Sequence, residues 1–260
     1  MVTMELNKIY NEDCLEGMKR IPDGSVDCII CDLPYGTTAS PWDSIIPLKE
    51  LWAQYRRITK PNAPIILFGS EPFSTMLRMS NLREWRYDWI WEKNSSAGFV
   101  HAKNRPLKNY EIISAFCQCG MGHKSTMGDK RMTYNPQGLI PVHITHKNSR
   151  NKFGNIIAKR ASHKEVTIQE WTNYPKAILK FDKDKSNYHP TQKPVDLIRY
   201  LVRTYTNVGG CVLDNCMGSG TTAIACIREK RNFIGFELNK EYYDKACKRI
   251  KLEMMQPSLF

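Results

Sequence analysis

The 260-residue sequence has no apolar run long enough to cross a membrane, which takes about 20 consecutive apolar residues in a helix. Its longest apolar segments, such as Pro64 to Phe68 and Cys28 to Cys31, have only the length of a buried β-strand. The first ten residues carry mixed charge and lack the apolar centre of a signal peptide. We therefore expect a cytoplasmic protein.

The sequence also lacks the cysteine pattern of a disulfide scaffold or a zinc site. Nine cysteines is an odd number, and they lie mainly in apolar stretches, where a reduced thiol behaves as a small hydrophobic residue. Two pairs, Cys28 with Cys31 and Cys117 with Cys119 near His123, invite a zinc-site interpretation. However, the first pair is typical of a strand rather than a metal-binding turn. We expect free core thiols and no metal site.

Acidic residues are in the minority: 38 Lys and Arg oppose 26 Asp and Glu, which gives a formal net charge of +12. Residues 118–188 alone hold 13 Lys and Arg against five Asp and Glu, a net charge of +8. Such a concentration favours a polyanionic partner, because each cation near a phosphate releases condensed counterions. The alternative is a solvated basic surface without a partner.

Strand-like and helix-like segments alternate on both sides of one irregular region, a pattern typical of a parallel sheet covered by helices. The expected strands are 25–31, 64–68, 87–92, 111–116, 211–214 and 233–238. The expected helices are 48–58, 195–205, 221–230 and 240–252. Residues 118–187 have little periodicity and are too long for a plain loop, so we interpret them as a functional insertion between residues 1–117 and 188–260. The insertion interleaves basic residues with aromatic ones, which suit contact with nucleic acid or the core of a small subdomain.

A glycine-rich loop follows the expected strand 211–214 and leads into a helix. Its sequence, DNCMGSGTT, lets a ligand approach the backbone at Gly218 and Gly220, and the helix amides favour a negatively charged group. Glu237 follows the next strand, where a carboxylate can accept hydrogen bonds from both hydroxyls of a ribose. The loop has no Gly-Lys-Ser/Thr and is not a phosphate-binding Walker loop. It also satisfies the Gly-x-Gly-x-x-Ala pattern of dinucleotide-binding enzymes, but too little chain follows it for a second mononucleotide-binding half.

A second loop, Asp32-Leu33-Pro34-Tyr35-Gly36, follows the strand that ends at Cys31. Loops at the carboxyl ends of parallel strands hold ligands in open α/β folds. An amino group on an aromatic base is a poor nucleophile until acceptors hold its two hydrogens. Asp32 and the Leu33 carbonyl supply two acceptors, Pro34 fixes the direction of that carbonyl, and Tyr35 offers a flat face for a base. The alternative is an ordinary turn that ends a strand.

With these two loops and the segment Tyr188 to Pro194 (YHPTQKP), the chain resembles the DNA amino-methyltransferases of the β-group, of phage or restriction-modification type. In that family a catalytic Asp-Pro-Pro-Tyr motif comes first, a target-recognition region follows and the glycine-rich motif comes last. The resemblance implies an α/β, Rossmann-like, circularly permuted fold with an inserted target-recognition region. It also implies S-adenosylmethionine as cofactor, double-stranded DNA as partner and a bacterial or phage-infected host cell. It leaves open a homodimer and a cognate restriction enzyme.

The resemblance assigns roles to residues at matching positions, and the basic insertion adds candidate DNA contacts. Catalytic roles fall to Asp32, Leu33, Pro34 and Tyr35. Cofactor binding falls to Asp13, Cys14, His189, Thr191, Gln192, Lys193, Asp214, Met217, Gly218, Ser219, Gly220, Thr221, Thr222, Glu237 and Leu238. The expected DNA contacts are Lys124, Lys130, Arg131, Lys147, Arg150, Lys152, Lys159 and Arg160.

Two positions depart from the family pattern: Leu33 replaces a proline, and Asn215-Cys216 replaces a common Pro-Phe. An acidic first residue, Asp32, resembles adenine-N6 enzymes more than cytosine-N4 enzymes, so we expect transfer to adenine N6 with the base flipped out of the duplex. The alternatives are cytosine N4, an RNA or protein amide, an inactive DNA-binding module and a nicotinamide oxidoreductase.

Overall fold

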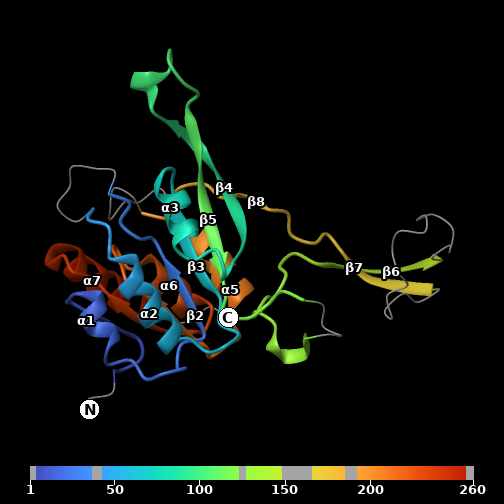
Figure 1. Cartoon of the computed structure of the whole chain (residues 1–260), viewed down its shortest axis with the longest axis horizontal. Helices are drawn as coiled ribbons and strands as arrows, with labels where there is room; N and C mark the ends of the chain where they lie inside the picture. The colour runs from blue at the N-terminus through green and yellow to red at the C-terminus, as the bar shows by residue number, and fades with distance from the viewer. Residues whose placement is uncertain (1–3, 37–42, 123–126, 148–165, 185–191, 256–260) are drawn as a thin grey trace.

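An eight-stranded mixed sheet forms the centre of the protein (Figure 1). The computed structural model describes residues 4–36, 43–122, 127–147, 166–184 and 192–255. Across the sheet the strand order is β1-β10-β9-β2-β3-β5-β4-β8. The strands are β1 (Lys8–Tyr10), β2 (Cys28–Cys31), β3 (Ile65–Gly69), β4 (Trp85–Ala97), β5 (Lys108–Phe116), β8 (Ile178–Lys180), β9 (Cys211–Asp214) and β10 (Asn232–Phe236). The expected α/β class is confirmed.

One strand runs against the rest of the sheet. The first five strands in this spatial order, β1, β10, β9, β2 and β3, are parallel to one another. β4 and β8 point the same way, but β5 is antiparallel to both of its neighbours. The expectation of an all-parallel sheet was therefore wrong for segment 111–116, whereas segment 87–92 lies in β4 and has the direction of the parallel strands. The ten residues between β4 and β5 are too few for a crossover helix, so the two strands pair directly as a hairpin.

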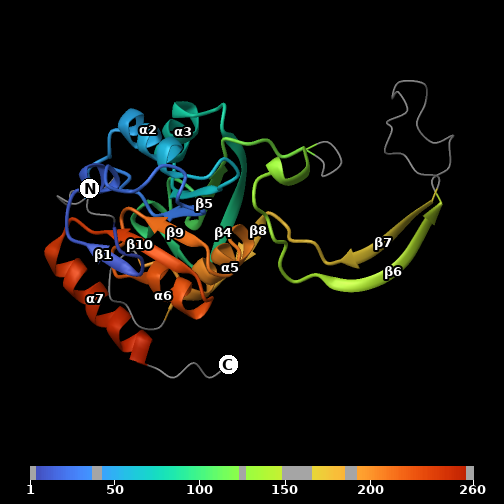
Figure 2. The ribbon, with the colours of Figure 1, turned by 90° about the horizontal axis from the view of Figure 1, so that it is seen from below.

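Helices cover both faces of the sheet, as Figure 2 shows. Helices α1 (Cys14–Met18), α2 (Leu48–Ile58) and α3 (Phe73–Ser80) lie on one face, and α5 (Val195–Tyr205), α6 (Thr221–Arg228) and α7 (Lys240–Met255) lie on the other. A hydrophobic core lies between the sheet and the helices on each face. Alternate residues of β2 contribute to the two cores: Ile29 and Cys31 pack on the side of α1, α2 and α3, whereas Cys28 and Ile30 pack on the side of α5, α6 and α7. This two-sided burial explains why the central strands are continuous apolar runs.

The strand order reverses between β2 and β9, which lie side by side with Cys28 opposite Val212 and Ile29 opposite Leu213. From β2 the chain passes through α2 to β3 on one side, and from β9 it passes through α6 to β10 on the other. Ligands of open α/β sheets bind outside the carboxyl ends of the strands at such a reversal. The two loops singled out in the sequence follow these two strands.

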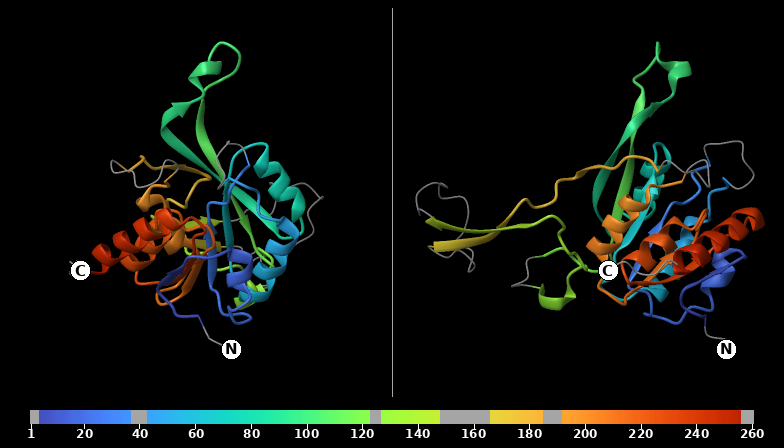
Figure 3. Two further views of the ribbon diagram at one scale, coloured as in Figure 1. Left: turned by 90° about the vertical axis from the view of Figure 1, so that its left-hand side faces the viewer. Right: turned by 180° about the vertical axis from the view of Figure 1, so that it is seen from behind.

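The region from 118 to 187 contains strands that the sequence did not predict. Strands β6 (Ile140–Lys147) and β7 (Val166–Thr172) pair antiparallel in an arm that projects away from the main sheet (Figures 1 and 3). Short β8 then pairs with β4 at the edge of the main sheet. Most residues of β6 and β7 are exposed, so the alternation that marks a half-buried strand is weak here.

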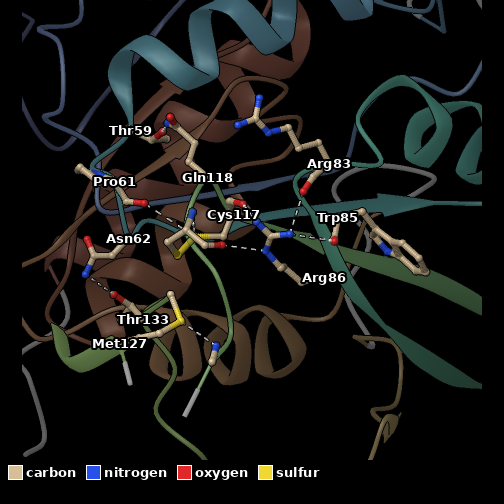
Figure 4. The surroundings of a disulfide bond; sticks show 12 residues. Thr59, Pro61, Asn62, Arg83, Trp85, Arg86, Cys117, Gln118, Met127 and Thr133 are labelled. Atoms are coloured by element: carbon tan, nitrogen blue, oxygen red, sulfur yellow. Dashed lines mark hydrogen bonds between the residues drawn. A yellow bond between two sulfur atoms is a disulfide. The ribbon is translucent and has the colours of Figure 1, made fainter. Parts of the chain in front are cut away.

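Two of the nine cysteines form a disulfide, Cys117–Cys119, which corrects the expectation of free thiols only (Figure 4). The chain turns as β5 ends and brings the two Cα atoms within 5.2 Å, inside the range that a disulfide spans. Arg86 donates to the carbonyl oxygens of both residues and stabilises the turn. The other seven cysteines are free, and Cys28 and Cys31 lie buried in β2 as expected.

The described residues hold neither a metal site nor a membrane span. No group of three or more His, Cys, Asp or Glu in this part of the chain is placed to hold a metal ion. His123, named in the zinc interpretation, lies outside the described residues. Within the same ranges, every helix is too short or too polar to cross a bilayer.

Candidate active site

A cavity of about 670 Å³ opens at the carboxyl edge of the sheet, above β2 and β9. Its walls include most of the residues that the sequence singled out: Asp13, Cys14, Asp32, Leu33, Pro34, Tyr35, Gln192, Lys193, Asp214, Met217, Gly218, Ser219, Thr221, Thr222, Glu237 and Leu238. Gly220 belongs to the same loop without lining the cavity, and His189 and Thr191 lie outside the described residues. A second cavity, of about 430 Å³ and bordered by Arg56, Arg83 and Arg86, contains none of the predicted site residues.

The glycine loop turns sharply between β9 and α6 because two glycines take left-handed backbone conformations. Gly218 has a φ of +53° and Gly220 a φ of +82°. A Cβ at Gly220 would come within 3.2 Å of Ala246, so a larger residue would push α7 away. A Cβ at Gly218 would meet only the Cys216 carbonyl oxygen, at 4.0 Å, and would otherwise occupy cavity space. Gly218 therefore keeps the backbone open to a ligand.

Glu237 joins the end of β10 to the glycine loop. Its Oε2 accepts a hydrogen bond from the Gly218 amide at 2.8 Å, and its Oε1 accepts one from the Asn239 amide at 2.8 Å. Burial raises the pKa of Glu237, against the two amide donors. Each oxygen keeps a second lone pair, so this carboxylate can still accept bonds from ligand hydroxyls on the cavity side.

Asp214 and Asn215, at the start of the same loop, stabilise it by hydrogen bonds. Asp214 is buried; it accepts bonds from the Thr222 hydroxyl at 2.6 Å and the Cys216 amide at 3.0 Å, and burial raises its pKa to about 6. Asn215, which replaces a common proline of the family, is accommodated by a hydrogen bond: its buried amide oxygen accepts a bond from the Tyr55 hydroxyl. The substituted position is therefore fully packed.

The Asp32 loop is fixed by its own side chains and by one residue downstream. Tyr35 donates its hydroxyl to Asp32 Oδ1 at 2.5 Å, and its ring stacks on Phe73 with 5.2 Å between centroids. Asp43 Oδ1 accepts bonds from the amides of Tyr35 at 2.7 Å and Gly36 at 2.9 Å. None of the described residues donates a hydrogen bond to the Leu33 carbonyl oxygen. The loop thus presents two acceptors in a fixed arrangement.

A buried chain of alternating charges supports Asp32 from behind. Lys193 is 7% exposed; its Nζ donates to Asp32 Oδ2 and lies 3.3 Å from Glu111 Oε2 in an ion pair without hydrogen-bond geometry. Lys93 in turn donates to Glu111 Oε1. The sequence associated Lys193 with the cofactor, whereas its observed contacts are with these two carboxylates. We refer to Lys93, Glu111, Lys193 and Asp32 as the charged chain.

The charged chain sets the protonation of its members. Burial raises the pKa of Asp32, and the negative charge of Glu111 adds to this against the Lys193 ammonium. The two carboxylates outweigh burial at Lys193 and raise its pKa, so it stays charged. Burial also opposes the charge of Glu111, but the two lysines lower its pKa below the ordinary value. The charged chain has two ammonium groups and two carboxylates, so its net charge is zero.

The site residues that sequence reasoning missed include Asp43, Glu111 and Lys93. Glu111 opens the apolar run of β5, and a charged residue at the start of a buried strand is the signal that could have marked it. Asp13 lines the cavity and also caps α1 by accepting hydrogen bonds from the amides of Leu15 and Glu16.

The predicted DNA contacts are only partly described. Lys130, Arg131 and Lys147 are exposed between the end of β5 and the tip of the arm. The remaining five lie outside the described residues: Lys124, Arg150, Lys152, Lys159 and Arg160. Among the aromatic residues of the same region, Phe181 packs on Tyr200, whereas Trp171 on β7 is 42% exposed.

Comparison with known proteins assigns the chain to a family. Residues 26–248 match the DNA methylase family of N6 and N4 methyltransferases. The chain belongs to this family. It is 28% identical to the Type II methyltransferase M1.MboII of Moraxella bovis, over 94% of this chain and 96% of that protein. It is 27% identical to the DNA adenine methyltransferase YhdJ of Escherichia coli K12, over 95% of this chain and 83% of that protein.

Solved structures of DNA methyltransferases share the fold. The M1.HpyAVI–SAM complex is 25% identical with a TM-score of 0.59, and the alignment covers 93% of this chain and 98% of that one. The cytosine-N4-specific PvuII DNA methyltransferase superposes with a TM-score of 0.64 at 14% identity, covering 99% and 89%, which supports the fold alone. This chain is therefore a DNA methyltransferase of the N6/N4 family with a Rossmann-like fold.

Proposed function

We propose that this DNA methyltransferase transfers a methyl group from S-adenosylmethionine to N6 of adenine in double-stranded DNA. The observation that carries the proposal is the meeting of two loops at one cavity: the Asp32 loop after β2 and the glycine loop after β9. The first loop offers acceptors for an amino group, and the second offers a backbone cradle with an acidic partner.

The cavity fits a nucleoside cofactor. Its volume of about 670 Å³ lies within the range of small-molecule sites, and Gly218 leaves the backbone bare where a Cβ would otherwise stand. Glu237 would hold the ribose hydroxyls, and the rim between Asp13 and Leu238 would hold the adenine. S-adenosylmethionine supplies an electrophilic methyl group on a sulfonium sulfur.

The protein contributes the acceptors that activate the target amine. With the base flipped into the cleft, Asp32 and the Leu33 carbonyl each accept one amino hydrogen and free the nitrogen lone pair from the ring. Tyr35 and Lys193 hold the Asp32 carboxylate in place, yet each of its oxygens keeps a lone pair for the base. As the nitrogen becomes positive, this fixed carboxylate stabilises the charge without reorganisation.

Two observations favour adenine over cytosine. The first loop residue is Asp32, and the relative YhdJ is named a DNA adenine methyltransferase. Cytosine N4 is the second candidate, because the fold also serves the cytosine-N4-specific PvuII enzyme. We further propose that residues 118–187 form the target-recognition region, since the arm projects from the catalytic sheet and carries exposed Lys147 and Trp171.

Labelled S-adenosylmethionine and unmodified duplex DNA test the proposal directly. After nucleoside digestion, mass spectrometry should find the label in N6-methyladenine. Label in N4-methylcytosine would keep the mechanism and overturn the base assignment. Asp32→Ala should nearly abolish transfer while calorimetry finds cofactor affinity retained, because Asp32 serves the amine; unchanged turnover in this variant would contradict the mechanism.

A further inference from the structure

The β4–β5 hairpin continues well past the sheet to which it belongs. β3 pairs with β5 only as far as Gly69 and Ile112, and β8 pairs with β4 only from Ile90 to Glu92. Beyond these points the two strands pair with each other alone, out to Ala97 and Lys108. Figures 1 and 3 show the hairpin rising above the rest of the molecule, away from the β6–β7 arm.

The tip of this hairpin exposes apolar side chains. Gly98, with a φ of +89°, turns the chain into a short 3₁₀ helix that begins with Phe99 and Val100. Phe99 is 68% exposed and Val100 is 92% exposed, the highest value among the large hydrophobic residues that the structure describes. A tip that only joined two strands would favour polar turn residues. Two adjacent apolar side chains at the end of a protrusion instead indicate a contact surface.

The same tip is exclusively basic in charge. Between Glu92 and Glu111 the sequence has four Lys and Arg and no Asp or Glu. Lys103 and Arg105 are exposed at the tip, and none of the described residues pairs with their side chains. Exposed apolar residues flanked by exposed cations match a partner that carries negative charge outside and flat apolar surfaces inside, which is the description of duplex DNA.

The hairpin also starts at the wall of the active site. Glu111, a member of the charged chain, lines the cavity and lies on β5 opposite Trp91. From Glu111 the strand runs outward to Lys108, a rise of about 10 Å, and the tip lies further along the same direction. Two paired strands fit the major groove of B-DNA, which is about 12 Å wide. A duplex with one base in the cavity would therefore extend within reach of the tip.

We propose that the β4–β5 tip is a DNA wedge: Phe99 and Val100 insert against the base stack beside the flipped base, and Lys103 and Arg105 bind the flanking phosphates. This inference rests on the proposed function, because it needs a DNA substrate whose base leaves the helix. An extruded base takes its stacking contacts with it, and apolar side chains at the tip replace part of them. The wedge is separate from the region 118–187, to which recognition is assigned.

Two double variants test the two halves of the tip. The test duplex is short, unmodified and contains a site that the wild-type enzyme methylates. Phe99→Ser with Val100→Ser should weaken binding to this duplex by about tenfold, while the salt dependence of binding stays the same. Lys103→Ala with Arg105→Ala should lower the slope of log affinity against log salt by about two. With 2-aminopurine at the target position, only the first variant should lose the fluorescence increase that reports base extrusion.

Matched controls lie elsewhere on the surface. Val208→Ser replaces an apolar residue of 71% exposure at the opposite edge of the sheet, and Lys248→Ala with Lys251→Ala removes two exposed cations from α7. These controls should bind DNA like the wild type, and all variants should keep the wild-type melting temperature and cofactor affinity.

The outcomes separate this inference from the proposed function. If the wild type methylates DNA but the tip variants bind, extrude and turn over normally, the wedge is refuted and the proposed function stands. A changed oligomeric state by light scattering, with DNA affinity unaltered, would make the tip a protein interface and also refute the wedge. A wild-type enzyme that binds no duplex would overturn both.

Discussion

Glu111→Gln isolates the electrostatic role of the charged chain, because it removes one negative charge and keeps the size of the side chain. Glu111 contacts Lys193 and Lys93, and Lys193 holds Asp32. The variant changes the net charge of these four side chains, the charged chain, from zero to +1. Since a growing positive charge on the target nitrogen is the feature that Asp32 stabilises, an uncompensated lysine next to Asp32 should raise the barrier to transfer.

The size of the effect follows from the distances. One Lys193 ammonium contacts both carboxylates, so Glu111 and Asp32 lie within about 6 Å of each other. A target nitrogen held by Asp32 would lie at about this distance from Glu111 or farther, and two unit charges about 6 Å apart interact by about 3 kcal/mol at an effective dielectric constant of 20. The Asp32 side chain is 26% exposed, and solvent screening reduces the figure to roughly 1–2 kcal/mol. We therefore expect kcat to fall about tenfold, with cofactor and DNA affinities unchanged.

The pH profile distinguishes this role from a structural one. Glu111 raises the pKa of Asp32 in addition to the larger effect of burial, so its neutralisation should lower that pKa. Because the ionised carboxylate is the active form, the acidic limb of kcat should move to lower pH even as the plateau falls. Glu92→Gln is the matched control, since Glu92 lies in β4 and pairs with the exposed Lys180 at 3.1 Å. An unshifted acidic limb in Glu111→Gln, or an equal loss of kcat in Glu92→Gln, would refute the reasoning.

Two further substitutions test the cofactor side of the cavity. Glu237→Ala should weaken S-adenosylmethionine binding by about 1.5–3 kcal/mol, the value of hydrogen bonds to a charged group, and calorimetry with unaltered affinity would remove Glu237 from the cofactor site. For Asp214, burial raises the pKa to about 6, so the native state holds a proton more tightly than the unfolded chain does. Stability should then fall by up to ~3 kcal/mol as pH rises from about 4 to about 6. Asp214→Asn should flatten this dependence in urea unfolding, and a slope equal to that of the wild type would count against the shifted carboxyl.

The sequence predicted best the helices and strands that are marked by the apolar pattern of their own residues. Helices 48–58 and 195–205 have the predicted bounds, because each carries one apolar face and stops where its amphipathic pattern stops. Strand 211–214 was equally clear, since it is buried on both faces and followed by glycines. The arm was missed because a two-stranded ribbon with both faces largely exposed has no buried face to impose alternation. The Cys117–Cys119 disulfide was missed because it depends on how the chain turns after β5.

The same limit explains why half of the charged chain escaped detection. The Asp32 loop follows a parallel strand, so its place at the carboxyl edge could be predicted, but Glu111 is the first residue of its predicted strand. In an all-parallel sheet, a residue at the start of a strand would lie at the opposite edge, far from the cofactor. Only the reversed direction of β5 brings Glu111 beside Lys193 and carries the β4–β5 tip outward on the active-site side. Strand direction is a pairing property of the whole sheet, so one wrong expectation about it concealed both the support of Asp32 and the hairpin from which we infer a DNA wedge.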